Sequence, residues 1–245
     1  MNVRLAGDIE RRLLINYAVD PDIAARLLPA PFRPQLVRGY AVAGICLIRL
    51  AGMRPSGVPR WLGVRSENAA HRIAVEWEAK GVVRRGVYIP RRDSNSWLNV
   101  AVGGRLYPGA HERAGFTVSE SPTRLRVAYT SADGSAAVDV DVAVVPELTG
   151  SALFPDLAAA STFFEQGADG YSATRGGRQS DGLGLRTTAW SAEAGHVNSV
   201  HSTFFDDDRR FPPGTSRLDC ALVMRDVPVA WQPLPSLGSE GAVST

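Results

Sequence analysis

The sequence predicts a mainly β protein, a single antiparallel barrel or curled sheet with short helices on its flank. Three observations predict this fold. Apolar and polar residues alternate over many short segments, turn residues separate those segments, and no strand is followed by the glycine fingerprint or helix of a βαβ unit. The 245 residues, of which 44% are hydrophobic and 21% charged, have the composition of a globular chain that can bury a full core.

The first half of the chain begins with a strand predicted over residues 12–19. Asp20 then begins a short helix, because its side chain can accept backbone N–H bonds and Pro21 fits the first helical position. Residues 40–50 are almost entirely apolar on both parities, which indicates a strand covered on both faces. Residues 73–89 alternate around a Lys-Gly turn, as in a β-hairpin.

A second hairpin is predicted around Asp133-Gly134, which is a signal for a two-residue turn. That turn places Val127 opposite Val140 and Arg126 opposite Asp141. Apolar residues then meet on one face of the hairpin and opposite charges on the other, so the register is self-consistent.

The second half of the chain continues with a helix predicted over residues 155–166, which Gly167 ends. Three strands follow, over residues 185–190, 197–205 and 217–224. The last segment, 232–245, is rich in Pro, Gly and Ser, as flexible termini often are. We therefore expect one domain over residues 1–231 and a flexible tail over 232–245.

Charge and cysteine content exclude several classes of protein. The 27 basic and 25 acidic residues leave a net charge of +2, which does not predict nucleic-acid binding. Charged residues interrupt the first twenty positions, and the longest uncharged apolar stretch, 39–48, is half of a membrane span. We expect a cytoplasmic protein without a membrane partner. Cys46 and Cys220 lie in apolar runs and are expected to be small buried hydrophobes, with no metal site.

The densest polar segment leads into the first hairpin. Glu67, Asn68, His71 and Arg72 cannot all face outward on one strand, so some must point into a core or cavity. A carboxylate held there would have a raised pKa or an arginine partner, and either state suits proton transfer. A buried structural ion pair would give the same pattern. Arg92, one of two adjacent arginines that point to opposite faces, could reach inward to Glu67 or to an anionic ligand.

His111 is the most suggestive of the four histidines. It follows a Pro-Gly turn and is next to Glu112, and a loop histidine beside a carboxylate can act as an acid or a base near neutral pH. The alternative is an exposed polar loop without a catalytic role.

The order of four segments resembles the acetoacetate decarboxylase-like superfamily, and most closely its uncharacterised bacterial branch. The resemblance runs from about Arg12 to Met224. It implies a conical antiparallel β barrel with an internal cavity, a small-molecule substrate and self-association into a homo-oligomer. Glu67 matches the strand glutamate of the family, and Arg105 matches its Gly-Arg. The segments are Leu27-Leu28-Pro29, Ser66-Glu67-Asn68, Gly86-Val87-Tyr88-Ile89-Pro90-Arg91-Arg92-Asp93 and Gly104-Arg105-Leu106-Tyr107-Pro108-Gly109.

The resemblance does not extend to the nucleophile of the family. Its decarboxylases form a Schiff base on a lysine, and the ungapped position of that lysine falls on Glu112, with His111 before it. The single lysine of this chain, Lys80, lies in a predicted exposed turn. A Schiff-base decarboxylase is therefore not expected.

Two functions remain open, with a purely structural role as a weaker third. The first is an enzyme without metal or organic cofactor that acts on a small carbonyl- or carboxylate-bearing metabolite by acid–base chemistry, as a lyase foremost, or as an isomerase or hydrolase. The second is a non-catalytic protein that binds a small molecule in the same cavity.

In the enzyme hypothesis, Glu67 is the acid or base, His111 is an alternative proton-transfer group, and Arg105 stabilises a developing anion. The substrate contacts are expected from Arg72, Arg92, His71 and Asn68. Because Glu67 shares the parity of the apolar residues of its strand, we expect it to point into the cavity beside Arg72, Arg92 or Arg105.

Overall fold

The computed structural model describes residues 4–102, 109–174, 177 and 179–238, and this part of the chain is mainly β. Its elements are, in order, β1 (Leu5–Val19), α1 (Pro21–Arg26), β2 (Arg33–Pro34), β3 (Leu36–Val37), β4 (Tyr40–Pro55), a 3-10 helix (Arg60–Leu62), β5 (Val64–Ala79), β6 (Val82–Ser94), α2 (Trp97–Val102), β7 (Glu112–Glu120), β8 (Arg124–Ser131), β9 (Ala137–Val145), α3 (Leu157–Gln166), β10 (Asp169–Ala173), β11 (Gln179–Arg186), β12 (Glu193–Ser202) and β13 (Ser216–Gly238).

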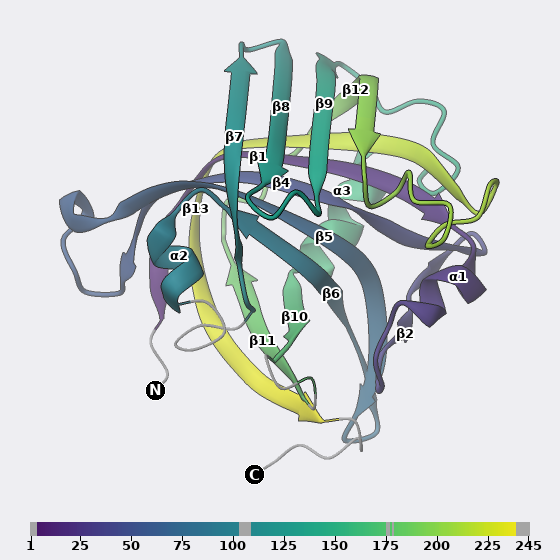
Figure 1. The fold of residues 1–245 in the computed structure, drawn as a ribbon, viewed down its shortest axis with the longest axis horizontal. Helices are drawn as coiled ribbons and strands as arrows, with labels where there is room; N and C mark the ends of the chain where they lie inside the picture. Colours follow the sequence, from purple (N-terminus) through teal and green to yellow (C-terminus); the bar gives the residue numbers. More distant parts are fainter. Residues whose placement is uncertain (1–3, 103–108, 175–176, 178, 239–245) are drawn as a thin grey trace.

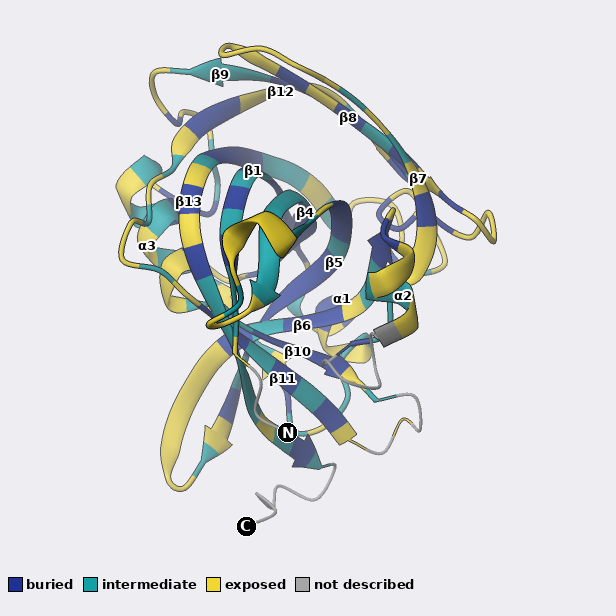
Figure 2. Ribbon diagram, turned by 90° about the vertical axis from the view of Figure 1, so that its left-hand side faces the viewer, coloured by how far each residue is buried: buried dark blue, intermediate teal, exposed yellow. Residues whose placement is uncertain are grey.

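The described strands form one sheet that closes on itself twice. Strands β13, β1, β4, β5, β6, β10 and β11 follow one another, and β11 pairs with β13 again, so these seven form a closed ring. Strands β7, β8, β9 and β12 connect β6 back to β13 and close a second ring. They stand at the top of Figure 1 and arch over the shared strands in Figure 2. The mainly β fold expected from the sequence, with short helices on its flank, is confirmed.

The expectation of a wholly antiparallel sheet needs one correction. β6 pairs in parallel with both β7 and β10, whereas the other pairings are antiparallel. These two strands do not follow β6 through a tight turn, so their direction is not fixed by a hairpin.

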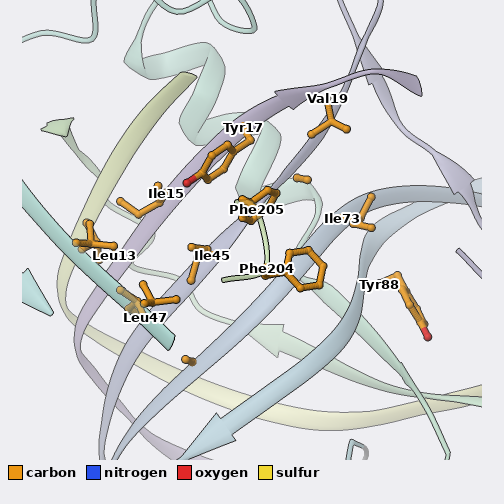
Figure 3. Packing of buried hydrophobic residues seen from close by; sticks show 14 of the residues in the cluster. Leu13, Ile15, Tyr17, Val19, Ile45, Leu47, Ile73, Tyr88, Phe204 and Phe205 are labelled. Carbon is orange, nitrogen blue, oxygen red and sulfur yellow. The ribbon is translucent and has the colours of Figure 1, made fainter. Parts of the chain in front are cut away.

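The strands shared by the two rings are buried on both faces. On one face of β1, Leu13, Ile15 and Tyr17 pack into the core of the second ring, where the ring of Tyr17 stacks on Phe205 (Figure 3). On the other face, Leu14 belongs to a hydrophobic cluster that includes Ala160 and Phe164 of α3. Because β4 lies beside β1 in the same wall, the apolar residues on both parities of 40–50 are explained.

The second hairpin has the predicted register. Val127 pairs with Val140, and Arg126 lies opposite Asp141. The loop, however, is longer than two residues, because the N–H of Ser131 donates to the carbonyl of Ala136. The ion pairs run diagonally, from Arg126 to Asp139 and from Arg124 to Asp141. The turn at Lys80-Gly81 lies where the first hairpin predicted it, with positive φ angles of 53° and 74°.

Helix α1 begins as predicted, whereas α3 begins at Leu157, two residues after the predicted start, and α2 was not predicted. The Asp20 side chain accepts from the N–H groups of Asp22 and Ile23, and Asp156 does the same for Ala159 in α3.

The C-terminal segment differs from the expected flexible tail. β13 is 23 residues long and extends to Gly238, and from Ala230 onward it pairs with β11. The pairing of β13 with β1 ends at Trp231, which lies opposite Leu5. Beyond Trp231, β1 therefore gives no partner to that edge of β13. A proline on such an edge loses no ladder bond, which is why a Pro-rich segment can continue the strand. The strand predicted over residues 185–190 is likewise shifted, because β11 ends at Arg186.

Candidate functional site

A cavity of about 390 Å³ lies inside the seven-stranded ring. All seven strands of the ring contribute to its wall, together with α2, His111 and the segment that follows α3. Most of the wall is apolar, with Ile48 and Leu50 from β4, Leu185 from β11 and Trp231 from β13. A concave apolar site with a few polar groups is the usual form of a small-molecule site.

Three arginines, Arg12 from β1, Arg72 from β5 and Arg92 from β6, line this cavity together with Arg54 from β4, whose guanidinium group bonds to backbone carbonyls. The described lining contains neither Asp nor Glu. The three guanidinium groups have neutral partners instead. Arg12 Nε donates to Cys46 Sγ at 3.4 Å, Arg92 Nε donates to the hydroxyl of Ser172 at 3.0 Å, and Arg72 Nη2 donates to Asn16 Oδ1.

The positive charge of the cavity is therefore not compensated by a described carboxylate. Burial lowers the pKa of Arg72 to about 10 and that of Arg92 to about 10, so both remain cations at neutral pH. Arg12 Nη1 and Arg72 Nε are buried and have no hydrogen-bond partner within the described part of the chain. Buried cations without a counter-ion are costly, so this cavity favours an anionic ligand.

His111 lines the same cavity. Burial, together with the charge of Arg92, lowers the pKa of its imidazole to about 3, so the ring is neutral at physiological pH. Its Nδ1 is buried without a described partner. His111 is thus a half-buried titratable group in the cavity wall rather than part of an exposed loop.

Asn68 also lines the cavity and is held by its neighbours. Its Oδ1 accepts from the hydroxyl of Ser94 at 2.7 Å and from Nδ2 of Asn99 at 3.0 Å, and its Nδ2 donates to Ser66 Oγ at 2.9 Å. Because Asn99 belongs to α2, this network fixes the helix against the ends of β5 and β6.

Glu67 lies elsewhere. It has the parity of Ile73, as predicted, but that face of β5 points into the core of the second ring and not into the cavity. Its carboxylate bonds to Arg11 Nη2 and Arg49 Nε, each at 2.5 Å, and both arginines also bond to Glu120. The expected contact with Arg72 or Arg92 is therefore not what the structure shows, and Arg105 lies outside the described residues.

His71 lies on the same face of β5 as Glu67, which points into the second ring. It is fully buried, its ring stacks on Phe204 with centroids 4.4 Å apart, and neither ring nitrogen has a described partner. It lines a separate cavity of about 390 Å³, which also includes Arg91 and Arg210. Of the seven site residues predicted from the sequence, the structure brings together Arg72, Arg92, Asn68 and His111 in the first cavity, and it separates Glu67 from them. His71 lines the second cavity, which shares Arg92 with the first.

Sequence reasoning missed Arg12 and Cys46. Arg12 begins the predicted strand 12–19, in which Asn16 is the one other polar side chain apart from the tyrosine hydroxyl, and a charge at the start of this apolar run was the available signal. Cys46 was expected to be a buried hydrophobe, and it is buried, but it also lines the cavity. Lys80 is exposed in its turn and is not part of the cavity wall.

Among the described residues, no group of three or more His, Cys, Asp or Glu side chains could hold a metal ion. None of the described helices is long and apolar enough to cross a bilayer.

Solved structures with the same fold cover nearly the whole chain. The enduracididine biosynthesis enzyme MppR, complexed with the condensation product of pyruvate and imidazole 4-carboxaldehyde, is 14% identical with a TM-score of 0.61, over 98% of this chain and 89% of MppR. Acetoacetate decarboxylase from Legionella pneumophila is 13% identical with a TM-score of 0.61, over 96% of this chain and 86% of that one. An acetoacetate decarboxylase-like enzyme from Sphingomonas wittichii RW1 is 12% identical with a TM-score of 0.59, over 97% and 92%.

At these identities, the likeness shows the fold and not the activity. No curated protein matches the sequence. The family model of DUF2071, described as an uncharacterized conserved protein, matches residues 8–208. The chain therefore belongs to the DUF2071 family, and its fold is that of the acetoacetate decarboxylase-like enzymes.

Proposed function

We propose that this protein is an enzyme that binds a small metabolite with a carboxylate and a carbonyl group in the cavity of the seven-stranded ring and transforms it by acid–base chemistry. The observation that carries the proposal is the presence of Arg12, Arg72 and Arg92 in the wall of an apolar cavity, where their guanidinium groups have no described carboxylate partner. Guanidinium binds carboxylates through parallel, charge-assisted hydrogen bonds, so this ligand class fits best. One structural neighbour, MppR, is complexed with pyruvate, which carries both groups.

Arg72 and Arg92 are proposed to hold the carboxylate, with Arg12 close enough to stabilise negative charge that develops on the carbonyl oxygen. These groups sit on three different strands of a closed ring, so their positions are fixed before the ligand enters. Asn68, held by Ser94 and Asn99, offers a further neutral polar contact.

His111 is proposed as the proton-transfer group. In the ligand-free cavity, burial and the charge of Arg92 keep the imidazole neutral and a weak base. A carboxylate bound to Arg92 offsets that charge, so it raises the pKa of His111 towards the ordinary range of histidine. Binding the substrate therefore prepares the base for abstraction of a proton next to the carbonyl group.

This assignment favours a lyase, isomerase or hydrolase type of reaction over a Schiff-base route. Lys80 is the single lysine of the chain, and its exposed position in the β5–β6 turn does not let it reach the cavity wall. Glu67 already bonds to two arginines, and we propose that it stabilises the fold rather than transfers protons. The second candidate, binding without chemistry, is supported by the predominance of apolar side chains in the wall.

Binding and proton transfer can be tested separately with pyruvate as the probe. Isothermal titration calorimetry should show binding to the wild type and a loss of at least about tenfold in affinity for Arg72→Gln and Arg92→Gln. Arg85→Gln is the matched control, because Arg85 is an exposed residue of the same strand as Arg92. Affinity that stays the same in Arg72→Gln and Arg92→Gln would contradict the proposal.

Proton abstraction is measured by NMR, as exchange of the methyl protons of pyruvate with deuterated water. The wild type should accelerate this exchange, and His111→Gln should lower the rate by roughly two orders of magnitude, the usual size of a general-base contribution. Binding without any acceleration by the wild type would favour the non-catalytic alternative.

A further inference from the structure

We infer that the substrate is amphipathic, with its carboxylate at the guanidinium groups and an unbranched apolar chain of several carbons along the opposite part of the wall. This inference rests on the proposed function, because it assumes that the three arginines hold a carboxylate. The inference concerns the part of the substrate that lies beyond its carboxylate and carbonyl groups.

The apolar part of the cavity is continuous. Ile48, Leu50, Ala168, Leu185 and Trp231 all line it, and all five belong to a single hydrophobic cluster around β13. Leu185 lies directly opposite Trp231 in the β11–β13 pairing, so two strands present their apolar side chains together.

The apolar wall begins where the guanidinium end of the cavity stops. Arg12 lies directly opposite Ile48 in the pairing of β1 with β4. Leu50 is two residues farther along the same face of β4, which corresponds to about 7 Å of extended strand. A ligand whose carboxylate is near Arg12 would therefore place its next carbons against Ile48 and Leu50.

Arg54 lines the far part of the cavity but does not make it polar. Its Nε donates to the carbonyl of Val58 at 2.9 Å, and its Nη1 donates to the carbonyl of Gly52 at 2.8 Å. The guanidinium group is thus occupied by the backbone of its own loop. Its neighbours in the wall, Met53 and Val64, are apolar.

The size of the cavity also exceeds that of a minimal carboxylate. A volume of about 390 Å³ corresponds to roughly a dozen non-hydrogen atoms at the ~30 Å³ that one water molecule occupies in the liquid. Pyruvate would fill roughly half of this space. Each further methylene buried on the apolar wall should then increase affinity about fourfold.

The test compares unbranched 2-oxo acids of increasing chain length, from pyruvate upward, by isothermal titration calorimetry. We expect affinity to rise about fourfold per methylene until the chain fills the cavity, and to fall for longer chains. Ala168→Leu adds volume at the apolar end and should shift the optimum to shorter acids, with the affinity for pyruvate retained. Leu50→Phe narrows the same end from β4 and replaces Ala168→Leu if that variant does not fold.

Ala189→Leu is the matched control, because Ala189 is exposed and does not line the cavity. Affinity that does not rise with chain length, while pyruvate still binds, would overturn the amphipathic class and leave the carboxylate site intact. A rise that neither Ala168→Leu nor Leu50→Phe alters would place the chain outside this wall and would also overturn the inference. Failure of every acid to bind, pyruvate included, would contradict the proposed function itself.

Discussion

Neighbouring arginines in this chain have opposite tasks, because adjacent residues of a strand point to opposite faces. Arg11 faces the second ring and forms ion pairs with Glu67 and Glu120, whereas Arg12 faces the cavity and donates to Cys46. The same division recurs at Arg91, which is paired with Asp93, and Arg92, which has the hydroxyl of Ser172. In both pairs, one charge stabilises the wall and the other remains available to a ligand.

Removal of the Glu67 charge should therefore affect stability and not binding. Glu67→Gln leaves the buried guanidinium group of Arg11 and the half-buried one of Arg49 short of a counter-ion and should lower the free energy of unfolding by roughly 3–5 kcal/mol. Urea unfolding measures this loss, and calorimetry with pyruvate should show unchanged affinity. Glu193→Gln, at an exposed pair with Arg225, is the control and should cost less than about 1 kcal/mol. Unchanged stability together with lost turnover would contradict this prediction and would indicate that Glu67 acts in catalysis.

His71 should make the protein sensitive to acid. Burial, together with the charges of Arg91 and Arg210, lowers its pKa to about 3, whereas the unfolded chain has the ordinary value near 6.5. As the pH falls, the unfolded state takes up the proton first, so stability is fully present above about pH 6.5 and is lost towards pH 3. His111, with a similarly lowered pKa, adds to the same effect.

His71→Phe keeps the stacking on Phe204 and removes the two unpartnered nitrogens. Its acid-unfolding midpoint, followed by circular dichroism, should lie at lower pH than that of the wild type. His196→Gln, at an exposed histidine, should leave the midpoint unchanged. If His71→Phe unfolds at the same or a higher pH, then His71 is protonated in the folded protein and its environment is not as described.

At the scale of single residues, the sequence predicted which side chains share a face of a strand, but not which of the two faces borders the cavity. Glu67 does share a face with Ile73, yet both faces of β5 are buried, and alternation alone cannot say which buried face borders a cavity. The position of the cavity depends on the strands that cover each face, and those strands come from distant parts of the chain.

Among the elements, hairpins were the most predictable because turn and alternation act together. A slip of one residue would move every apolar side chain to the wrong face, so the pairing of Val127 with Val140 is strongly specified. Loop length was less predictable. Asp133 accepts hydrogen bonds from the hydroxyl groups of Ser131 and Ser135, and these side chains stabilise a wider turn than Asp-Gly alone would suggest.

The wall shared by the two rings depends on a close approach of β1 and β4 at Gly44. A Cβ atom on this residue would lie 2.2 Å from the carbonyl oxygen of Ile15, which belongs to the backbone and cannot move aside as a side chain would. Gly44→Ala should therefore destabilise the protein by at least about 2 kcal/mol, measured by urea unfolding. Gly115→Ala is the control, because a Cβ there meets no atom within 4 Å. Equal stability of the two variants would show that β1 and β4 can separate without cost.

At the scale of the whole molecule, ring closure was the feature that local sequence could not predict. β11 and β13 pair although β12 lies between them in the chain, and no turn signals this contact. Composition indicated a flexible end from residue 232, whereas the strand continues because β11 offers it a partner. Tertiary pairing thus outweighed local propensity at the point where the ring closes.

The C-terminal part of β13 should be needed for the apolar half of the cavity. A chain that ends at Trp231 lacks the partners of β11 from Gln179 to Gly184 and so opens the ring beside Leu183. A chain that ends at Gly238 keeps all of this pairing and is the matched control. The shorter chain should melt at a temperature lower by on the order of 10 °C, because several ladder hydrogen bonds are lost.

Hydrogen exchange followed by mass spectrometry should show faster exchange in β11 of the shorter chain. The arginines lie on β1, β5 and β6, so pyruvate should still bind, while the gain in affinity with longer 2-oxo acids should disappear. If the chain that ends at Trp231 exchanges and selects acids as the control does, then β11 does not depend on β13 for its place in the ring. In that case, the cavity wall is held by the pairing of β11 with β10 alone.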